Sequence, residues 1–221
     1  RVRIRKIFPK LIELGFTPEK ICETSESMAQ IRIALEAEAS KLLAKSCYLG
    51  SAGYIKLDAV KLFSEPKEVL LRVLIRALLC VGGGVYPPRL MKLENLYEKM
   101  KFALRDSKVT WKGTTLAGCR ILLIKHGSGA IKFLLCREER LLPKPLSVSG
   151  SLIQYWDNRF QLHLTGSYYE ENTNVKIQPL GQKGWETLCK ECPSIQYSHV
   201  PKAAGITLPT LVDGEGISAV P

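Results

Sequence analysis

Apolar residues recur at helical spacing early in the chain, with polar residues between them. Positions seven residues apart fall on one side of a helix, which predicts an apolar stripe along a long helix ending near Ser46. Thr17 and Pro18 suit the N-cap and the first helical position of this helix. We interpret the stripe as a core-facing surface. Its members are Ile21, Met28, Ile31, Leu35, Ala39 and Leu42.

Further helices are predicted up to about position 105. Asp58 can cap a brief helix. The next helix stops at Gly82-Gly83-Gly84, since glycine readily adopts the left-handed conformation of a helix C-cap. Pro87-Pro88 precede the last one, and the all-helical subdomain is predicted to close near Ser107. The helices cover residues 58–63, 65–81 and 89–105, after a short extended piece at 54–57.

Alternation replaces helical spacing after position 108. His126-Gly127-Ser128-Gly129 separates two runs rich in β-branched and apolar residues, which predicts a β-hairpin. Leu142-Pro143-Lys144-Pro145 predicts a linker, and Asp213-Gly214 can form the turn of another hairpin. Strands are predicted over residues 114–125, 130–137, 152–164, 175–179 and 208–220, with a short helix over 184–189.

These elements predict an α+β fold. Residues 1–107 form a helical domain, residues 108–145 a β-hairpin and linker, and residues 146–221 a mixed, mainly β C-terminal domain. The chain starts abruptly at Arg1 without an initiator Met, so we expect it to be a piece of a longer protein.

The positive charge is concentrated in the first two thirds of the chain. Residues 1–150 hold 27 of the 32 Lys and Arg and 14 of the 21 acids, a net charge of +13, whereas residues 151–221 carry −2. Such an imbalance favours polyanionic partners, nucleic acid first, because phosphates neutralised by Lys or Arg release counterions. The alternative is a basic protein whose charges only solvate it.

The seven cysteines indicate reduced thiols and a cytoplasmic protein. Cys189 and Cys192 form one CxxC, but a structural zinc site needs a second pair or histidines at ligand spacing. We therefore predict no metal site and leave the role of these two cysteines open. No apolar run reaches 18 residues, so no membrane span is expected.

No catalytic centre is predicted within the chain. Gly82-Gly83-Gly84 lacks the Lys-Ser or Lys-Thr of a phosphate loop, and it follows a helix instead of preceding one. Glu138 and Glu139 are adjacent, so on an extended segment they point to opposite faces and cannot share a proton. We expect no catalytic, cofactor-binding or metal-binding residue here.

Basic residues are the candidate binding groups. An extended segment would place Arg1, Arg3 and Arg5 on one side, whereas a helix would spread them over an arc. Arg89 begins a predicted helix, where phosphate is favoured, although it could equally cap the helix or form an ion pair. The complete predicted set is Arg1, Arg3, Arg5, Arg89, Lys92, Arg120, Lys125, Arg137, Arg140 and Lys144.

Several motifs occur in an order that resembles the C-terminal two thirds of bacterial tRNA(Ile)-lysidine synthases. They begin with Arg1-Val2-Arg3-Ile4-Arg5 and Phe8-Pro9. The others are Gly82-Gly83-Gly84-Val85-Tyr86-Pro87-Pro88-Arg89, Thr115-Leu116-Ala117-Gly118-Cys119, Arg137-Glu138, Trp156-Asp157-Asn158-Arg159-Phe160, Leu180-Gly181-Gln182-Lys183-Gly184 and Leu208-Pro209-Thr210-Leu211.

The resemblance implies a ligase that uses ATP to adenylate the wobble cytidine of the CAU anticodon of tRNA(Ile). Free lysine then displaces AMP. In that family ATP and lysine are bound by an N-terminal domain with a Ser-Gly-Gly-x-Asp-Ser loop, which does not occur in this sequence. The resemblance therefore implies a tRNA-binding segment without the catalytic domain. The alternative is a structural or protein-interaction module that packs on a catalytic partner. Whether residues 146–221 touch tRNA, and whether the protein forms a homodimer, stay open.

Overall fold

The computed structural model describes residues 2–105, 111–125, 130–148, 153–164, 175–197 and 200–221. Its helices are α1 (Val2–Glu13), α2 (Pro18–Ser46), α3 (Ala59–Phe63), α4 (Lys67–Gly82), α5 (Leu90–Arg105), α7 (Gly181–Glu191) and α8 (Lys202–Gly205), with 3-10 turns at Glu139–Leu141 and Pro193–Tyr197. Its strands are β1 (Cys47–Gly50), β2 (Tyr54–Asp58), β3 (Thr114–Leu116), β4 (Cys119–Lys125), β5 (Ile131–Arg137), β6 (Leu146–Ser147), β7 (Ile153–Trp156), β8 (Phe160–His163), β9 (Lys176–Pro179), β10 (Pro209–Val212) and β11 (Ile217–Ala219).

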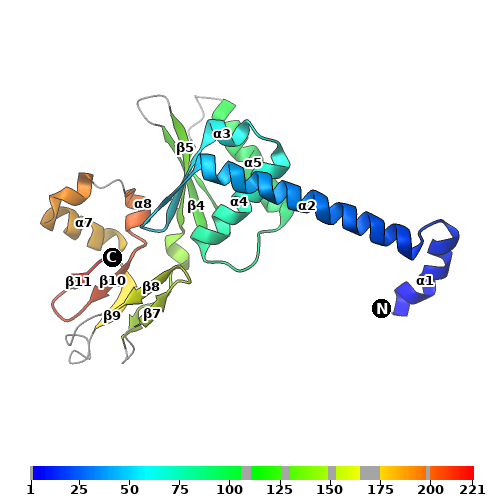
Figure 1. Ribbon diagram of the computed structural model, residues 1–221. Helices are drawn as coiled ribbons and strands as arrows, with labels where there is room; N and C mark the ends of the chain where they lie inside the picture. The colour runs from blue at the N-terminus through cyan, green and yellow to red at the C-terminus, as the bar shows by residue number, and fades with distance from the viewer. Residues whose placement is uncertain (1, 106–110, 126–129, 149–152, 165–174, 198–199) are drawn as a thin grey trace.

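A five-stranded antiparallel sheet in the order β1-β2-β5-β4-β3 forms the centre of the molecule. Alternate residues of its strands, such as Leu57, Ile121 and Phe133, are buried in one core with the apolar side of α4. Helices α3, α4 and α5 lie on this side, and α8 lies on the other (Figure 1). The α+β fold predicted from the sequence is confirmed.

The first 107 residues are not purely helical, contrary to the prediction. Strand β2 pairs with β5, with Leu57 opposite Phe133, and β1 pairs with β2. The extended piece at 54–57 was predicted, but β1 was missed. Strand β1 has only four residues and follows α2 directly, so it is too short to show a clear alternating pattern.

Helix α2 confirms the long predicted helix. The Thr17 hydroxyl accepts a hydrogen bond from the backbone N–H of Lys20. However, the core-facing interpretation of its stripe holds only near the C-terminal end. Ala39 and Leu42 are buried, whereas Met28 is 61% exposed and Ile31 is 53% exposed. Together, α1 and the first half of α2 project from the rest of the protein as an arm (Figure 1).

Two predicted strands are each divided by a tight turn. The run 114–125 consists of β3 and β4, joined at Ala117 and Gly118 with φ of 50° and 76°. The described part of the run 152–164 consists of β7 and β8, with Asp157 and Asn158 both at φ 53°. Three of these four residues are not glycine, so the sequence lacks the glycine-based signal by which tight hairpin turns are usually recognised.

The C-terminal residues form a four-stranded antiparallel sheet in the order β11-β10-β9-β6, beside the two-stranded β7-β8 sheet. Trp156, Leu164, Val175 and Ile177 are buried between these sheets. The hairpin predicted at Asp213-Gly214 is confirmed, because the Asp213 carboxylate accepts hydrogen bonds from the backbone N–H groups of Glu215 and Gly216. Helix α7 is longer than the predicted 184–189.

Candidate functional site

A polar cleft of about 440 Å³ lies between α5 and the turn that joins β3 to β4. Lys92, Asn95 and Lys99 line it from α5, at a spacing that places all three on one side of the helix. Strand β3 and its turn supply the opposite wall. The remaining lining residues are Leu96, Thr114, Thr115, Leu116, Ala117, Gly118, Glu138 and Leu141.

The position of the α5 wall follows from the amphipathic sequence of the helix. Leu93, Tyr97 and Met100 are buried in the core, so the side bearing Lys92 and Lys99 is left at the surface. Among the described residues, neither Lys92 nor Lys99 forms an ion pair. Glu138 is the acidic residue in the lining. The cleft therefore presents two cations and one anion to solvent.

The β3–β4 turn is held against the end of α4 by close backbone approach. A Cβ atom on Gly82 would lie 2.1 Å from the carbonyl oxygen of Ala117, so glycine is required there. Gly83, with φ 66°, caps α4 as predicted. It also faces the carbonyl oxygen of Asp157, 2.7 Å from the position of its own absent Cβ. The glycine run thus serves packing as well as helix termination.

A buried ionic network is hydrogen-bonded to two residues that line the cleft. Arg137 donates from Nε and Nη2 to the two carboxylate oxygens of Asp157, each at 2.8 Å. It also donates from Nη1 to the carbonyl oxygen of Gly118 at 3.0 Å and from Nη2 to that of Leu141 at 2.9 Å. The hydrogen bonds that Arg137 donates to Asp157 raise the pKa of Arg137. Because Gly118 and Leu141 line the cleft, Arg137 fixes its shape.

These contacts favour a structural role for Arg137, and its contact with tRNA stays a prediction. Its side chain is only 9% exposed, and four of its five N–H groups are already donated to protein oxygens. In the sequence Arg137 is grouped with other basic residues, because its partner Asp157 is 20 residues away and is not recognisable as such. We assign Arg137 a positioning role.

The other predicted basic residues lie in three places. Lys92 lines the cleft, and the exposed Arg89 precedes α5, where its carbonyl oxygen accepts the N–H groups of Lys92 and Leu93. Arg140 and Lys144 are exposed on the segment after β5. Arg120 and Lys125 are exposed on β4. Arg120 alternates with Cys119 and Ile121, which are buried among the helices, so it lies on the opposite face of the sheet.

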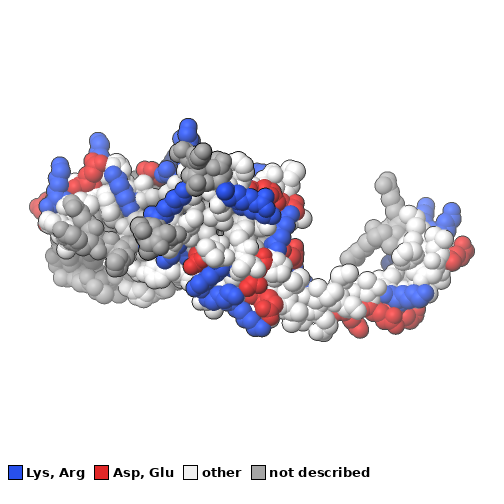
Figure 2. Space-filling model, turned by 90° about the horizontal axis from the view of Figure 1, so that it is seen from above, with Lys and Arg blue, Asp and Glu red and all other residues white. Residues whose placement is uncertain are grey.

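The N-terminal arginines are far from the cleft. Helix α1 shows that the helical alternative applies from Val2 onward. Arg5 is exposed on α1, and α1 forms the far end of the arm (Figure 1). Arg1 and the side chain of Arg3 lie outside the described residues. Figure 2 shows basic side chains spread over the body with acidic ones between them, so this view contains no single continuous basic surface.

Sequence reasoning missed four residues of this region. Asn95 and Lys99 could have been found, since they share the helical side of Lys92. Asp157 and Arg159 lie on the β7–β8 turn, and only the tertiary structure brings that turn to Arg137. Arg159 donates from Nε to Asp157 at 2.7 Å, so the one carboxylate serves two arginines.

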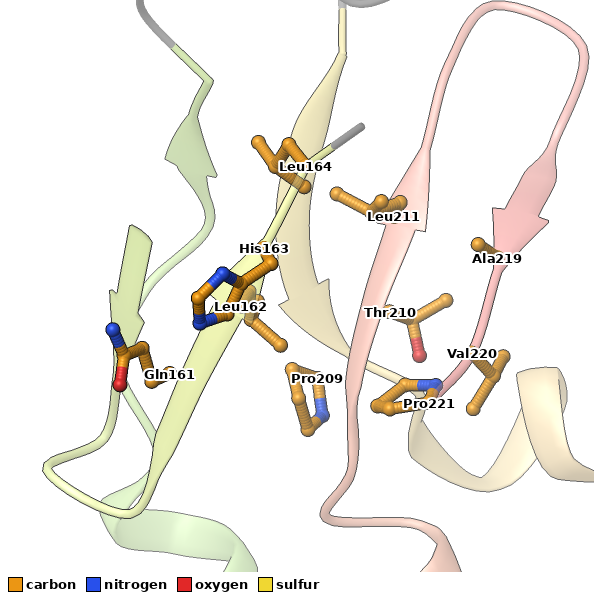
Figure 3. Close-up of a pocket in the computed structure, with 10 residues that line it drawn as sticks. All are labelled: Gln161, Leu162, His163, Leu164, Pro209, Thr210, Leu211, Ala219, Val220 and Pro221. Carbon is orange, nitrogen blue, oxygen red and sulfur yellow. The ribbon is translucent and has the colours of Figure 1, made fainter. Parts of the chain in front are cut away.

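A second pocket, of about 280 Å³, lies between β8 and the β10–β11 pair (Figure 3). Its lining is largely apolar, including Leu162, Leu164 and Leu211, with Gln161 and His163 at one side. Its described lining residues include no Lys or Arg, so it suits a polyanion less well than the cleft.

The described residues contain no group of three or more His, Cys, Asp or Glu that could hold a metal ion. Cys189 is half-buried and Cys192 is exposed at the end of α7, and both are free thiols. Within the described part of the chain, no helix combines the length and hydrophobicity needed to cross a membrane.

No protein-family model matches the chain. It is similar to three curated tRNA(Ile)-lysidine synthases. The protein from Ruegeria pomeroyi is 28% identical over 222 residues, which cover the whole chain and 46% of that protein. The protein from Anaplasma marginale is 22% identical over 239 residues, covering the whole chain and 48% of that protein. The protein from Methylobacterium nodulans is 36% identical over 98 residues, 43% of this chain and 29% of that protein.

The chain spans about half the length of the two relatives that it matches throughout, and it corresponds to their C-terminal part. Several motifs that resemble this family meet at one place in the structure. Gly82 and Gly83, the Ala117-Gly118 turn, Arg137 and the Asp157-Asn158-Arg159 turn are in direct contact around the cleft.

Proposed function

We propose that this chain is the tRNA-binding part of a tRNA(Ile)-lysidine synthase. The observation that carries the proposal is its similarity, along its full length, to proteins of that name. The parent enzyme would use ATP to activate the wobble cytidine of a CAU anticodon, and lysine would then displace AMP. ATP and lysine would be held by a part of the enzyme that this chain does not contain. The enzyme would act in the cytoplasm.

The chain would contribute to this reaction by positioning. Holding the tRNA body in a fixed orientation makes the attack on one base effectively unimolecular, which lowers the barrier without a contact to the reacting atoms. Lys92 and Lys99 would neutralise backbone phosphates, and Asn95 between them could donate to a phosphate or ribose oxygen. Arg89, Arg140 and Lys144 would extend this contact along the nucleic acid.

Two features of the cleft support phosphate binding. Its lysines form no ion pair among the described residues, so a phosphate would not have to displace a carboxylate from them. Its walls are also held in place, because Gly82 packs against the β3–β4 turn and Arg137 donates hydrogen bonds to Gly118 and Leu141. Rigid supports of this kind reduce the entropy lost when a ligand binds.

The test is tRNA(Ile) affinity measured by filter binding over a series of salt concentrations. The Lys92→Glu/Lys99→Glu variant should bind at least about tenfold more weakly, and the slope of log K against log salt should fall by about 2, one unit for each phosphate contact. A wild-type affinity that does not change with salt would contradict phosphate contacts altogether.

The matched control is Lys183→Glu/Lys190→Glu, which makes the same change in net charge on exposed positions of α7. It should retain most of the affinity and the salt slope. Equal losses in the two variants would show that overall charge, and not the cleft, governs binding.

A second candidate function is protein association, and the exposed stripe of α2 favours it. Ile21, Met28 and Ile31 are between 41% and 61% exposed on one side of the arm. Large exposed apolar surfaces on soluble proteins often mark interfaces. Under this function, Met28→Lys would reduce the mass of the assembly measured by light scattering and leave tRNA affinity unchanged. An unchanged mass would count against it.

A further inference from the structure

A further cavity, with a mainly apolar lining, lies beside Arg159 of the Asp157 network. Its volume is about 450 Å³, and it is bounded by the β1–β2 turn, the end of α4 and the start of β8. Phe160 lines it from β8, Arg159 from the β7–β8 turn and Cys80 from α4. The β1–β2 segment contributes Leu49, Gly50, Ser51 and Gly53.

Arg159 lines this cavity, and one of its nitrogens has no protein partner among the described residues. Its side chain is 3% exposed, its Nε donates to Asp157 at 2.7 Å and its Nη2 donates to the carbonyl oxygen of Thr207 at 3.3 Å. The guanidinium group lies over the ring of Phe160, 4.9 Å from its centroid. Nη1 is buried and has no hydrogen-bond partner among the described residues. A buried donor without an acceptor is unfavourable, so an acceptor is expected here.

The local charge points to an anionic acceptor. Arg137 and Arg159 share the single carboxylate of Asp157, and the three side chains are between 3% and 9% exposed. This group therefore carries one positive charge in excess, away from the screening effect of water. Burial lowers the pKa of Arg159, and the charge on Arg137 acts in the same direction. Arginine nevertheless stays protonated in proteins, so the excess charge persists.

Gly53 adds no side chain of its own next to Nη1 and the Phe160 ring. Its φ is +70°, and a Cβ atom there would lie 3.1 Å from Nη1 and 3.0 Å from Cζ of Phe160. Ser51, two residues earlier, is exposed on the cavity wall. Its hydroxyl can donate a second hydrogen bond to a group held by Arg159.

We propose that this cavity is an anion site that takes a phosphate group, with Nη1 of Arg159 as the principal donor and Ser51 on its wall. Phosphate suits the planar, multiply donating guanidinium group. The group can come from free phosphate or from the backbone of bound RNA. If the phosphate group belongs to bound RNA, this inference rests on the proposed function. A site for free phosphate does not.

The first experiment uses inorganic phosphate and the whole chain. Thermal unfolding is followed in phosphate and in chloride at equal ionic strength, because a ligand of the native state raises Tm as its concentration rises. We expect a larger Tm increase in phosphate for the wild type. A Tm increase in phosphate should persist in Lys92→Glu/Lys99→Glu, since the cleft is a separate site.

The site is tested most directly by two variants that differ by one charge at position 51. Ser51→Asp places a carboxylate on the cavity wall, where it can satisfy Nη1 and repel phosphate, whereas Ser51→Asn is its neutral counterpart. Ser51→Asp should fold, and it should need about tenfold more phosphate than Ser51→Asn for the same Tm increase. Equal responses of the two variants, or equal effects of phosphate and chloride, would overturn the site.

The source of the phosphate group is decided by tRNA binding in the same two variants. If RNA supplies it, Ser51→Asp should weaken tRNA binding relative to Ser51→Asn and lower the salt slope by about 1. If tRNA binding is equal while the phosphate response differs, the site takes free phosphate. A wild type that binds no tRNA would reject the proposed function but leave the thermal result intact as the test of this site.

Discussion

Asp157 is the residue on which two buried arginines depend. Its carboxylate accepts hydrogen bonds from Arg137 and Arg159, and all three side chains are at most 9% exposed. Removing one partner from a buried ionic group leaves uncompensated charge in a medium that solvates it poorly. At the scale of single residues, stability and the shape of the cleft are therefore coupled through one side chain.

We expect Asp157→Asn to lower the free energy of unfolding by about 3–5 kcal/mol, because both guanidinium groups lose their counter-ion. The measurement is urea denaturation. The control is Glu186→Gln, which removes an exposed carboxylate 3.9 Å from Lys202 and should change stability by less than about 0.5 kcal/mol. Equal effects of the two substitutions would contradict the importance of the buried network.

Two buried thiols give the protein a predictable response to alkaline pH. Burial raises the pKa of Cys119 to about 12 and that of Cys136 to about 11. In the unfolded chain these thiols lose their protons near pH 9.0, while the native state still binds them. The unfolded state then binds fewer protons, so stability falls as pH rises from about 9 towards 12.

The corresponding measurement compares urea denaturation at about pH 8 and pH 10 for the wild type and Cys119→Ala. The variant should lose less stability over this interval, since it lacks one of the two thiols.

Labelling of the native protein near pH 8 should modify the exposed Cys22 and Cys192 but not Cys119 or Cys136. Rapid labelling of Cys119 in the native state would contradict its burial.

At the scale of elements, the end of α4 illustrates how a helix stop also becomes a packing surface. The sequence predicted a glycine cap, and Gly83 provides it with φ 66°. Gly82 has a different function, because the carbonyl oxygen of Ala117 occupies the place of its Cβ, at 2.1 Å. Gly84 has ordinary contact distances, with Leu79 at 3.8 Å from a Cβ in that position.

These distances predict a clear contrast between neighbouring substitutions. Gly82→Ala should lower the free energy of unfolding by at least about 1–3 kcal/mol, because the β3–β4 turn must move away. Gly84→Ala should have little effect. Chemical denaturation of both variants checks this, and similar values would mean that α4 and the turn do not meet as described.

At the scale of the whole molecule, a well-packed body carries a sparsely packed arm (Figure 1). Helix α4 buries Leu70, Leu74 and Leu78 completely, whereas the buried residues of α2 are confined to Ala39, Leu42 and Ser46. Local stability follows the number of buried apolar contacts, so the two parts should open independently.

Hydrogen exchange should show this difference directly. Backbone amides of α4 should exchange most slowly, those of α2 after Ala39 at intermediate rates, and those of α1 and residues 18–34 most rapidly. If a protein partner covers the arm, its amides should become protected when that partner is added. Uniform protection along the whole of α2 in the isolated chain would contradict the exposed stripe.

The sequence by itself determined helices α2 to α5, the predominance of strands after position 108 and the uneven distribution of charge. These properties are local, since periodicity, capping residues and glycine stops act over a few neighbouring positions. The ordered motifs also indicated the family to which the curated relatives belong.

Only the tertiary structure decided which of these residues meet. Arg137 resembled the other basic positions until Asp157 was placed against it, and the stripe of α2 resembled a core face until half of it proved to be exposed. The pairing of β2 with β5 and the approach of Gly82 to Ala117 join distant parts of the chain. Burial and ion pairing depend on such long-range contacts, and no local pattern of residues encodes them.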